Sequence, residues 1–510
     1  MPPLMYNLIS FLGIFGLCAI AWLFSEHRRI IPWRVIISGI ALQLILGAFV
    51  FRVPITRDLL QGFSSLLDGV FLAADTGANF VFGSNIVPLP TRPAAVNLGY
   101  IFAFRALPTV VFFSGLMALL ENIGVIQVIT NVFAKVFYKV MGLSGAEALS
   151  GAANIFVGIE AAIVVKPYLP KMTRSELCAI LACCFGTAAS STLAIYVSYL
   201  RPVFPNILGH LVSASIMAIP ACFVLSKILV PETETPVTAG GIPEEEKITK
   251  RRSKDYTGTD FDGEDLEEKE ELMAKETAMG EPIQRVSPLD AAILGALEGV
   301  KMAVSIAAVL ILIVGLVSLI NQIFAALAAL PAPIGSIFKL LTLANIQGAL
   351  FYPLTLLTGV PFEESWIASV IIGRRLLETA IPPYQALAEA AKNGLVSERT
   401  VLIVSYALSG FAHLASVGIF VGGTIALIPS RRKDISELGW KALFIGTLAT
   451  LMIACIAGVY DNGDASILGQ KAAPVQQEQT TPPPPPVATP AATPKATPEA
   501  NKTPKVPVKR

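Results

Sequence analysis

The sequence predicts an all-α polytopic membrane protein with about eight transmembrane helices, two re-entrant helical hairpins in inverted repeats, and interfacial helices. Of the 510 residues, 54% are hydrophobic and only 15% are charged, whereas about a quarter of the residues in a soluble protein are charged. Several windows contain the roughly 20 apolar residues that are needed to cross a bilayer. In addition, apolar segments broken by Gly and Pro recur at corresponding places in the two halves of the chain, as in secondary transporters.

The apolar windows account for the predicted spans. Each is long enough to cross the bilayer as one helix. The eight windows are 5–24, 33–51, 100–120, 176–199, 207–229, 292–320, 400–428 and 438–459.

Basic residues between the windows predict the orientation of the chain. The first window lacks the basic start and the cleavage site of a signal peptide, and "SEHRRIIPWR" follows it. The positive-inside rule places this loop in the cytoplasm, and likewise the stretch "PSRRKD" (429–434) before the last window. We therefore expect both termini to be extracytoplasmic and the number of complete crossings to be even.

Four further segments are apolar but interrupted. Residues 57–88 and 122–143 suit helices that lie at the membrane interface. Residues 144–170 and 340–372 are candidate re-entrant hairpins, which are tolerated at membrane depth only inside protein or beside a cavity. Each is followed by two further apolar segments, so the order hairpin, span, span occurs twice.

The resulting domain organisation has six parts. The charged segment in the middle and the Pro-rich tail cannot bury enough apolar surface to fold alone, so we expect a flexible cytoplasmic loop and a disordered extension. A regulatory site in the loop and a cell-wall or glycosylated stalk in the tail are the alternatives. The parts are 1–143 (scaffold and interfacial helices), 144–230 (first transport repeat), 231–290 (charged loop), 291–335 (scaffold helix), 336–460 (second transport repeat) and 461–510 (tail).

Composition and motifs argue against several classes of function. The formal net charge of +1 lacks the basic excess of a nucleic-acid-binding protein. The six Cys residues lie in hydrophobic segments, and only three His residues exist. There is no phosphate-binding Gly-Lys-Ser/Thr loop, no His/Cys metal cluster and no supported Ser/His/Asp arrangement, so we predict that the protein is not an enzyme and has no cofactor.

Several long motifs resemble one known family. They occur in order from about residue 5 to 460: "ALPTVVFFSGLMALLENIGVIQ", "SGAEALSGAANIFVG", "KPYLPKMTRSEL", "VPETE" and "ALSGFAHLASVGIFVGGTIALIPSRRKDISELGWKAL". Together they are similar to the concentrative nucleoside transporter family. The resemblance implies a homotrimer with a scaffold and a mobile transport domain, which imports nucleosides with Na⁺ or H⁺ by an elevator-like movement.

The resemblance also implies an ion site. The side chain of Asn154 and the carbonyl of Val157 match the family's sodium ligands at a hairpin tip, and Thr187 and Ala188 match the segment that provides the others. Broken helices supply the free carbonyl oxygens that such ions prefer. Alternatively, Thr187 and its small neighbours serve only close helix packing, and Glu160 carries a coupling proton.

The substrate motifs depart from the family pattern. Where the family has Gly-Gln-Thr-Glu, this chain has "GIEA", which places Ile159 at the base-reading position and Glu160 at the Glu. Where the family has Asn-Glu, "GRRLLETAIPPYQAL" places Thr379 and Ala380, with Glu378 two residues early. We expect the two prolines that follow to turn Glu378 into the pocket. Glu160 is expected to bind solute, unless it forms a buried pair with Lys166 or Arg375.

The last motif supplies the remaining candidate ligands. Phe411 and Ser416 match the family's base-packing Phe and ribose-binding Ser, while His413 replaces a ribose-binding Asn. Thr192 is a further candidate beside the predicted ion site. His413 can donate, accept or titrate near neutral pH, although a lone His in an apolar helix is also a common core residue.

These observations leave three functional hypotheses. The first is a multi-pass, cation-coupled nucleoside symporter of the cell membrane. The second is a transporter of the same fold for another small polar solute, such as a nucleobase or a modified nucleoside, because the altered groups are those that discriminate solutes. The third is a membrane-embedded sensor that signals through the charged loop.

Overall fold

The computed structural model describes residues 3–52, 69–89, 91, 101–156, 158–166, 168–241, 287–463 and 467–469. For Ile159, Glu160, Ile163, Ser190, Ser191, Ile334 and Leu340 it describes the backbone only. Most of the charged loop and of the Pro-rich tail therefore lie outside the described residues, as do the predictions made for them.

The described chain is built of helices, and six of those described are long and apolar enough to cross a membrane. These are α1 (Pro3–Leu23), α2 (Trp33–Arg52), α4 (Phe102–Asn122), α9 (Ile207–Leu229), α12 (Pro288–Ala328) and α19 (Arg432–Tyr460).

Two of the eight predicted spans are interrupted helices, and here the structure differs from the expectation of straight spans. Window 176–199 forms α7 (Arg174–Gly186) and α8 (Ser190–Leu200), and window 400–428 forms α17 (Glu398–Ala407) and α18 (Leu414–Leu427). The first break consists of Thr and Ala residues, and the second contains Leu408 and Phe411, so a hydropathy window does not distinguish either from the helix around it.

The two interrupted helices meet at their breaks. A Cβ on Gly410 would lie 2.7 Å from the carbonyl oxygen of Gly186, so a side chain at position 410 would collide with the other backbone. The backbone N–H of Phe411 donates to the carbonyl of Thr187 (3.2 Å). Gly is therefore required at 410 for this close approach, and a hydrogen bond links the two interruptions.

The first predicted hairpin is present. It consists of α6 (Gly145–Ala153), a turn that begins at Asn154, and the 3₁₀ helix η2 (Ile159–Val165). The Ser150 hydroxyl donates across the hairpin to the carbonyl of Ala161 (3.1 Å). Helices α7, α8 and α9 follow, which is the predicted order of hairpin and spans.

The second broken segment is longer than the predicted 340–372. Helices α14 (Leu343–Leu357) and α15 (Ser365–Glu378) pack against each other, and the chain turns again at Thr379 and Ala380 into α16 (Ile381–Lys392). Pro382 and Pro383 occupy the first turn of α16, where a helix does not need their missing N–H groups. Helices α17, α18 and α19 then repeat the order seen in the first half.

Capping residues explain why corresponding helices begin where they do. Thr173 before α7 and Ser397 before α17 each accept a hydrogen bond from the backbone N–H three residues later. Such caps satisfy a helix N–H that otherwise has no partner. Ser144 before α6 forms a capping box with Glu147, and Thr173 forms another with Glu176.

The remaining described helices lie before, between or within these repeats. The amphipathic segment predicted at 122–143 contains α5 (Val125–Val136) and a π-helical turn, and the segment predicted at 57–88 contains a helix at Gly69–Phe82. The others are η3 (Leu169–Lys171), α13 (Ile334–Leu340) and η4 (Pro429–Arg431).

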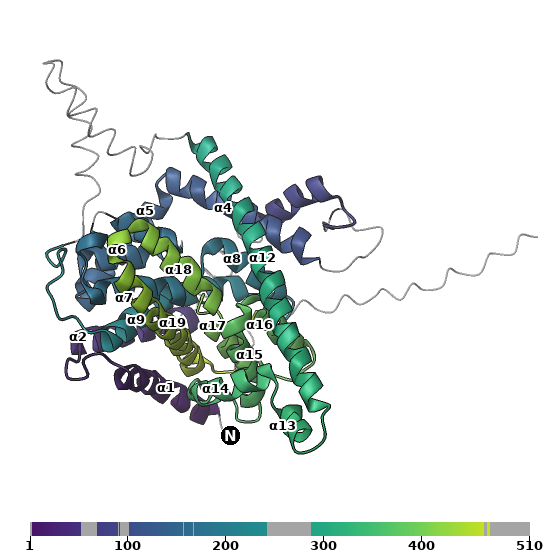
Figure 1. The fold of residues 1–510 in the computed structure, drawn as a ribbon. Coiled ribbons are helices and arrows are strands. Elements are labelled where there is room, and N and C mark those ends of the chain that lie inside the picture. Colours follow the sequence, from purple (N-terminus) through teal and green to yellow (C-terminus); the bar gives the residue numbers. More distant parts are fainter. Residues whose placement is uncertain are drawn as a thin grey trace, which may run out of the picture. The chain divides into compact units, whose positions relative to one another are not determined.

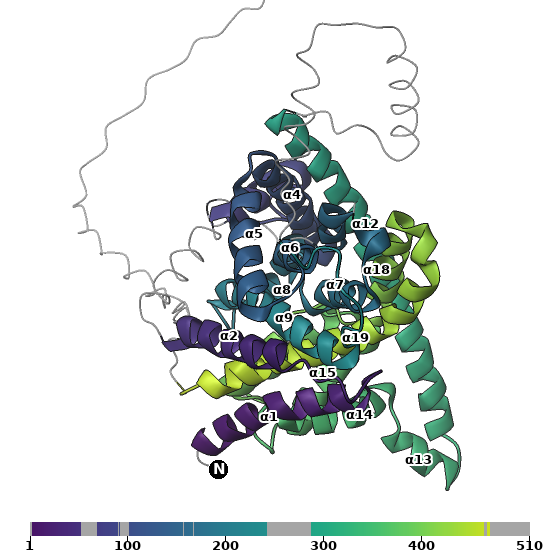
Figure 2. The ribbon, with the colours of Figure 1, turned by 90° about the vertical axis from the view of Figure 1, so that its left-hand side faces the viewer.

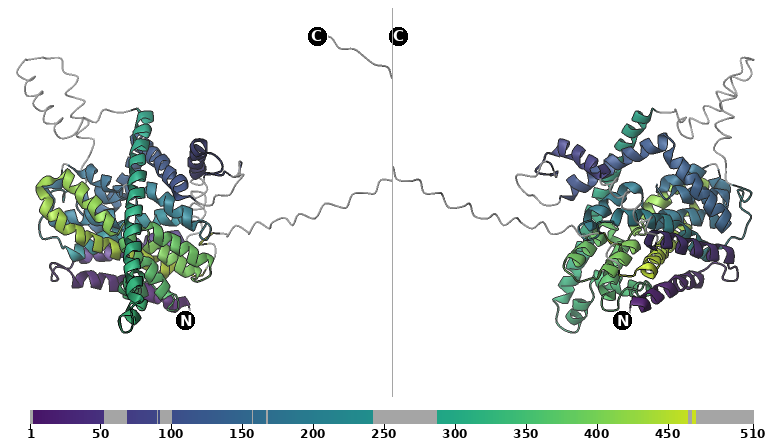
Figure 3. Two further views of the ribbon diagram at one scale, coloured as in Figure 1. Left: turned by 45° about the vertical axis from the view of Figure 1, so that its right-hand side comes forward. Right: turned by 180° about the vertical axis from the view of Figure 1, so that it is seen from behind.

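Burial separates a central body from a peripheral pair of helices. The apolar windows of α9 and α19 are each 89% buried inside the protein, whereas that of α12 is 6% buried. Helix α12 runs along α4, and these two make one of the most extensive helix contacts of the fold. Figure 1 and the left view of Figure 3 show α12 as a long helix along one side of the body. Figure 2 shows α1 and α2 on either side of α19, where α1 and α19 are in contact.

Candidate functional site

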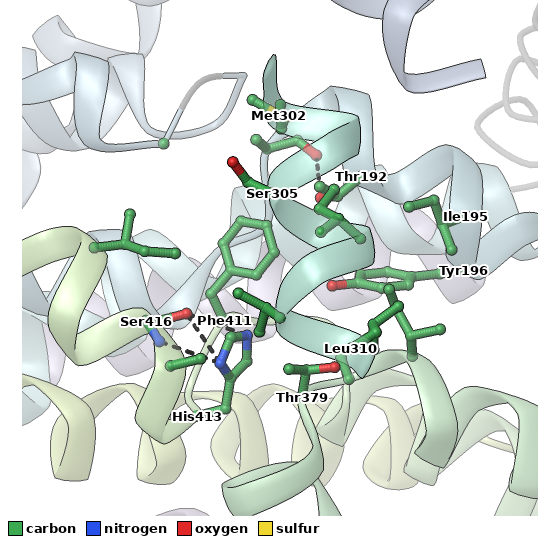
Figure 4. A pocket seen from close by; sticks show the side chains of 18 of the residues that line it. Thr192, Ile195, Tyr196, Met302, Ser305, Leu310, Thr379, Phe411, His413 and Ser416 are labelled. Atoms are coloured by element: carbon green, nitrogen blue, oxygen red, sulfur yellow. Dashed lines mark hydrogen bonds between the residues drawn. The ribbon is translucent and has the colours of Figure 1, made fainter. Parts of the chain in front are cut away.

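A cavity of about 210 Å³ lies where the helices are interrupted. Helix α12 forms one side of it, through residues that include Met302, Ser305 and Leu310. The other side is formed by the beginning of α8, the turn between α15 and α16, and the beginning of α18. Figure 4 shows these side chains around the cavity.

Three helices begin at the cavity wall. Ala189, Ala380 and His413 are the residues that immediately precede α8, α16 and α18, and all three line the cavity. A helix N-terminus carries a partial positive charge and free N–H groups. The cavity therefore favours electronegative atoms such as carbonyl and hydroxyl oxygens over groups with a positive charge.

His413 is both a helix cap and part of the cavity wall. Its Nδ1 accepts a hydrogen bond from the backbone N–H of Ser416 (3.3 Å), and the Ser416 hydroxyl lies 3.1 Å from both ring nitrogens. An accepting Nδ1 carries no proton, so the neutral ring holds its proton on Nε2. The imidazole thus caps α18, as a Ser or Asp side chain often caps a helix, and its ring still lines the cavity (Figure 4).

Aromatic side chains line the same cavity. The ring centroids of Phe411 and Phe420 are 6.1 Å apart, and the Phe411 ring makes an edge contact with the His413 ring. Tyr196 stacks on Tyr384 with ring centroids 4.5 Å apart. The rings of Phe411, Phe420 and Tyr196 line the cavity and offer flat, apolar surface to a planar group.

Four of the substrate residues predicted from the sequence line the cavity: Thr192, Phe411, His413 and Ser416. The Thr192 hydroxyl donates to the carbonyl of Ala189 (2.8 Å). The side chains of Ile159 and Glu160 lie outside the described part, although Gly158 beside them is at the cavity.

Glu378 is placed differently from the expectation. Its carboxylate is buried and forms an ion pair with Arg374 one helical turn earlier (2.8 Å), and it does not line the cavity. The prolines start a new helix instead of turning Glu378 inward. Because α15 ends at Glu378, the next two residues, Thr379 and Ala380, face the cavity.

Sequence reasoning missed three kinds of cavity residue. Thr379 was placed in register with a ligand position but was not proposed as a ligand. Tyr196 and the α12 residues gave no signal, because aromatic and aliphatic side chains in an apolar helix are the ordinary case. The signal for Thr379 was available in the prolines that follow it, since they mark a helix start.

The residues predicted to bind sodium lie at the hairpin tip and at the first helix break. Asn154 is fully buried at the end of α6, its Nδ2 donates to the carbonyl of Ser150 (3.2 Å), and its Oδ1 has no hydrogen-bond partner. Thr187 and Ala188 form the break between α7 and α8 and are also buried. Val157 lies outside the described residues. A buried amide oxygen without a hydrogen-bond partner suits a hard cation such as Na⁺.

Buried charges stand at one end of the first hairpin. The Lys227 ammonium of α9 contacts Glu147 of α6 (2.5 Å) and Glu232 (3.1 Å) and donates to the Ser175 hydroxyl of α7 (3.1 Å). The Ser144 hydroxyl donates to Glu176 (2.6 Å). This network fixes the start of the hairpin against α7 and α9.

A helical body with hairpins, two crossing interrupted helices and a cavity at their breaks defines a membrane carrier for a small solute. Comparison with known proteins agrees with this class. Models described as Na⁺ dependent nucleoside transporter N-terminus and C-terminus match residues 12–85 and 210–458, and a nucleoside recognition model named Gate matches 103–203.

Individual relatives extend over nearly the whole chain. The nucleoside permease NupC of Helicobacter pylori is 31% identical over 89% of this chain and 98% of its own length. An uncharacterized transporter of Haemophilus influenzae is 35% identical over 90% of this chain and 99% of its own length. The chain therefore belongs to the Na⁺-dependent, or concentrative, nucleoside transporter family, which confirms the resemblance seen in the sequence.

Solved structures agree in fold. CNTnw in an inward-facing substrate-bound state is 35% identical, with a TM-score of 0.73 over 89% of this chain and 98% of that chain. A variant of CNTnw in an outward-facing state matches over the same shares, with a TM-score of 0.74. The all-α polytopic fold expected from the sequence is thus confirmed.

Proposed function

We propose that this protein is a cation-coupled symporter that imports nucleosides across the cell membrane by an elevator-like, alternating-access movement. The observation that supports this most directly is the cavity between α12 and the interrupted helices. A solute held there contacts α12 on one side and the broken segments on the other. A displacement of the broken segments along the α4–α12 pair would carry the solute with them, while its ligands stay in place.

The coupling ion that we propose is Na⁺. Asn154 Oδ1, the carbonyl of Val157 and oxygens of Thr187 and Ala188 would hold it. The unpartnered Oδ1 of Asn154 supports this assignment. The hydroxyl of Thr187 donates to the carbonyl of Cys183 (2.8 Å), so its lone pairs stay available for a cation. Coupling to H⁺ through Glu160 is the competing proposal.

The proposed topology places both termini outside the cytoplasm. Glu26 in the α1–α2 loop contacts Arg174 at the start of α7 and Lys441 of α19, and Arg431 donates to the carbonyl of Met172 (2.8 Å). The basic stretches that the positive-inside rule assigns to the cytoplasm thus meet at one end of the helical body, which supports a single cytoplasmic face. A homotrimer, as the family resemblance implies, is part of the same proposal.

The deciding experiment is uptake of labelled uridine and adenosine into proteoliposomes that contain the full chain. We expect accumulation when Na⁺ is high outside, and no accumulation with equal Na⁺ on both sides. Accumulation driven by a proton gradient alone would show that H⁺, and not Na⁺, is the coupling ion. Absence of uptake and of nucleoside binding under every gradient would contradict the proposed function.

A second candidate is a carrier of the same fold for another small polar solute. It is favoured by one observation: among the side chains described at the cavity, there is no carboxylate and no amide. Competition of labelled uridine uptake by free nucleobases and modified nucleosides separates the two. A nucleobase that competes tenfold better than its nucleoside would favour the second candidate.

A further inference from the structure

Thr379 is the residue of the cavity wall with an unusual backbone. It stands between the end of α15 and the start of α16, with φ 69° and ψ −176°. Among the described residues other than Gly, it is the one with positive φ. This region is essentially limited to Gly, and for a β-branched residue it is strained. The position therefore holds a side chain that the local backbone disfavours.

The hydroxyl of Thr379 is also unsatisfied. The residue is 7% exposed, and its Oγ1 is buried without a hydrogen-bond partner. Two other hydroxyls in the described wall are hydrogen-bonded within the protein: Thr192 donates to the carbonyl of Ala189, and Ser416 is bonded to His413. A buried hydroxyl without a partner destabilises the folded protein. Within the described protein, no polar group pairs with the Thr379 Oγ1.

The surroundings of Thr379 indicate where its partner belongs. Figure 4 shows Thr379, His413 and Phe411 around the same cavity, which all three residues line. A solute with a planar part against Phe411 would extend its other end past His413 toward Thr379. A Thr hydroxyl both donates and accepts, so it matches a hydroxyl group of the solute.

We propose that Thr379 determines specificity by forming a hydrogen bond from its Oγ1 to a sugar hydroxyl of the bound nucleoside. This inference rests on the proposed function and adds a ligand to it. The strained turn holds the hydroxyl in the cavity before the solute arrives, so little freedom is lost on binding. A solute without sugar hydroxyls leaves the Thr379 hydroxyl buried and unpaired, and is discriminated against for that reason.

The test compares uridine with 2′,3′-dideoxyuridine in the wild type and in Thr379→Val, Thr379→Ser and Thr379→Gly. Val keeps the shape and removes the hydroxyl, Ser keeps the hydroxyl, and Gly removes both the hydroxyl and the strain. In the wild type and in Thr379→Ser we expect the KM for the dideoxynucleoside to exceed that for uridine by at least about fivefold, the factor for one neutral hydrogen bond. In Thr379→Val and Thr379→Gly the ratio of the two KM values should fall by about fivefold, through a rise in the KM for uridine.

Melting temperatures distinguish a binding role of Thr379 from a structural role. We expect Thr379→Gly to melt at a higher temperature than the wild type, because Gly adopts this φ without strain. A matched control is Thr355→Val, since the Thr355 hydroxyl donates to the carbonyl of Phe351 within α14 and is not at the cavity. It should leave the ratio of KM values unchanged.

Two outcomes would overturn the inference. One is a wild-type protein that transports uridine while folded Thr379→Val keeps the same KM ratio; the proposed function would then stand without this ligand. The other is a wild-type protein that binds and transports no nucleoside, in which case the proposed function and the inference fail together.

Discussion

Arg375 of α15 is a fully buried cation that acts on the end of another helix. It donates from Nη1 to the carbonyl of Ala407, the last residue of α17, and from Nη2 to the Thr450 hydroxyl of α19 (3.0 Å). Carbonyls at a helix C-terminus have no partner within the helix. The guanidinium supplies one and so fixes the loop that leads to Phe411 and His413.

Replacing Arg375 should disturb solute binding through this loop. In Arg375→Met the Ala407 carbonyl and the Thr450 hydroxyl lose their donor. The Thr450 hydroxyl still donates to the carbonyl of Thr447 (2.9 Å), whereas a buried carbonyl left unpaired costs about 1–3 kcal/mol. We expect a lower melting temperature and a raised KM for uridine. Arg375→Lys should restore part of both, because one ammonium replaces one of the two donors.

The KM is the informative readout for Arg375. Substitution of the exposed Lys433, which lies away from the cavity, serves as the control. If Arg375→Met melts early but binds uridine with an unchanged KM, the role of Arg375 is stability alone.

Residue-scale features were only partly visible in the sequence. The pairing of Glu378 with Arg374 follows from their spacing of four residues, which places them on one helix face. The φ of Thr379 does not follow from any local pattern, because packing of α15 and α16 against their neighbours imposes it. Register alone placed Thr379 at the site, and its unpaired hydroxyl required the structure.

At the scale of elements, the first hairpin is attached to its neighbours by charge. Lys227 and Glu147 are 6% and 1% exposed, so both charges are removed from water and depend on each other. Breaking such a pair leaves an uncompensated buried charge. The start of α6 is thus held by α9, while its other end at Asn154 reaches the proposed ion site.

Lys227→Met should therefore destabilise the protein strongly. We expect a loss of about 3–5 kcal/mol, the range for one partner removed from a buried pair. Adding Glu147→Gln should recover a large part of this loss, because the unpaired charge is then absent. Thermal unfolding in detergent measures both, with exposed Lys392→Met expected to change little.

Equal stability of Lys227→Met and wild type would show that the contact contributes nothing to the hairpin. A double variant no more stable than the single one would show that the unpaired Glu147 charge is not the cause of the loss.

The elements themselves were largely predictable, with one systematic error. Apolar windows found α1, α2, α4, α9, α12 and α19 because a long hydrophobic run has few other structures. The break after Gly186 was missed because its Thr and Ala residues are nearly neutral in hydropathy, and the break after Ala407 because Leu408 and Phe411 keep that window apolar. What ends each helix there is the crossing of two backbones, a contact between positions more than 200 residues apart.

At the scale of the whole molecule, a cluster of charges at the proposed cytoplasmic end connects distant parts of the chain. Glu26 contacts Arg174 and Lys441, and Arg174 also contacts Glu437 (2.7 Å). Partial burial raises the pKa of Glu26, but hydrogen bonds and charge from Arg174 and Lys441 outweigh this and hold the pKa below its ordinary value of 4.5. The ionised carboxylate is therefore favoured in the folded protein.

This lowered pKa predicts how stability depends on pH. A group whose pKa is lower when folded contributes stability above its unfolded pKa, and the contribution disappears as the pH falls through the folded value. The melting temperature of the wild type should therefore exceed that of Glu26→Gln at neutral pH. The difference should shrink as the pH falls below about 4.5, which melting curves from about pH 6 to pH 3 would measure.

A constant difference between the two proteins across that range would exclude Glu26 as the titrating group. If Glu26→Gln is as stable as the wild type at neutral pH, solvent screens the ion pairs of this partly exposed cluster so strongly that they add no net stability.

The hydrogen bond between Phe411 and Thr187 has a thermodynamic consequence for the whole transporter. Thr187 belongs to the proposed ion site and Phe411 to the proposed solute site, so occupancy of either restrains a backbone that both share. Binding linkage is reciprocal. Whatever factor a saturating ion contributes to the affinity for the solute, a saturating solute must contribute the same factor to the affinity for the ion.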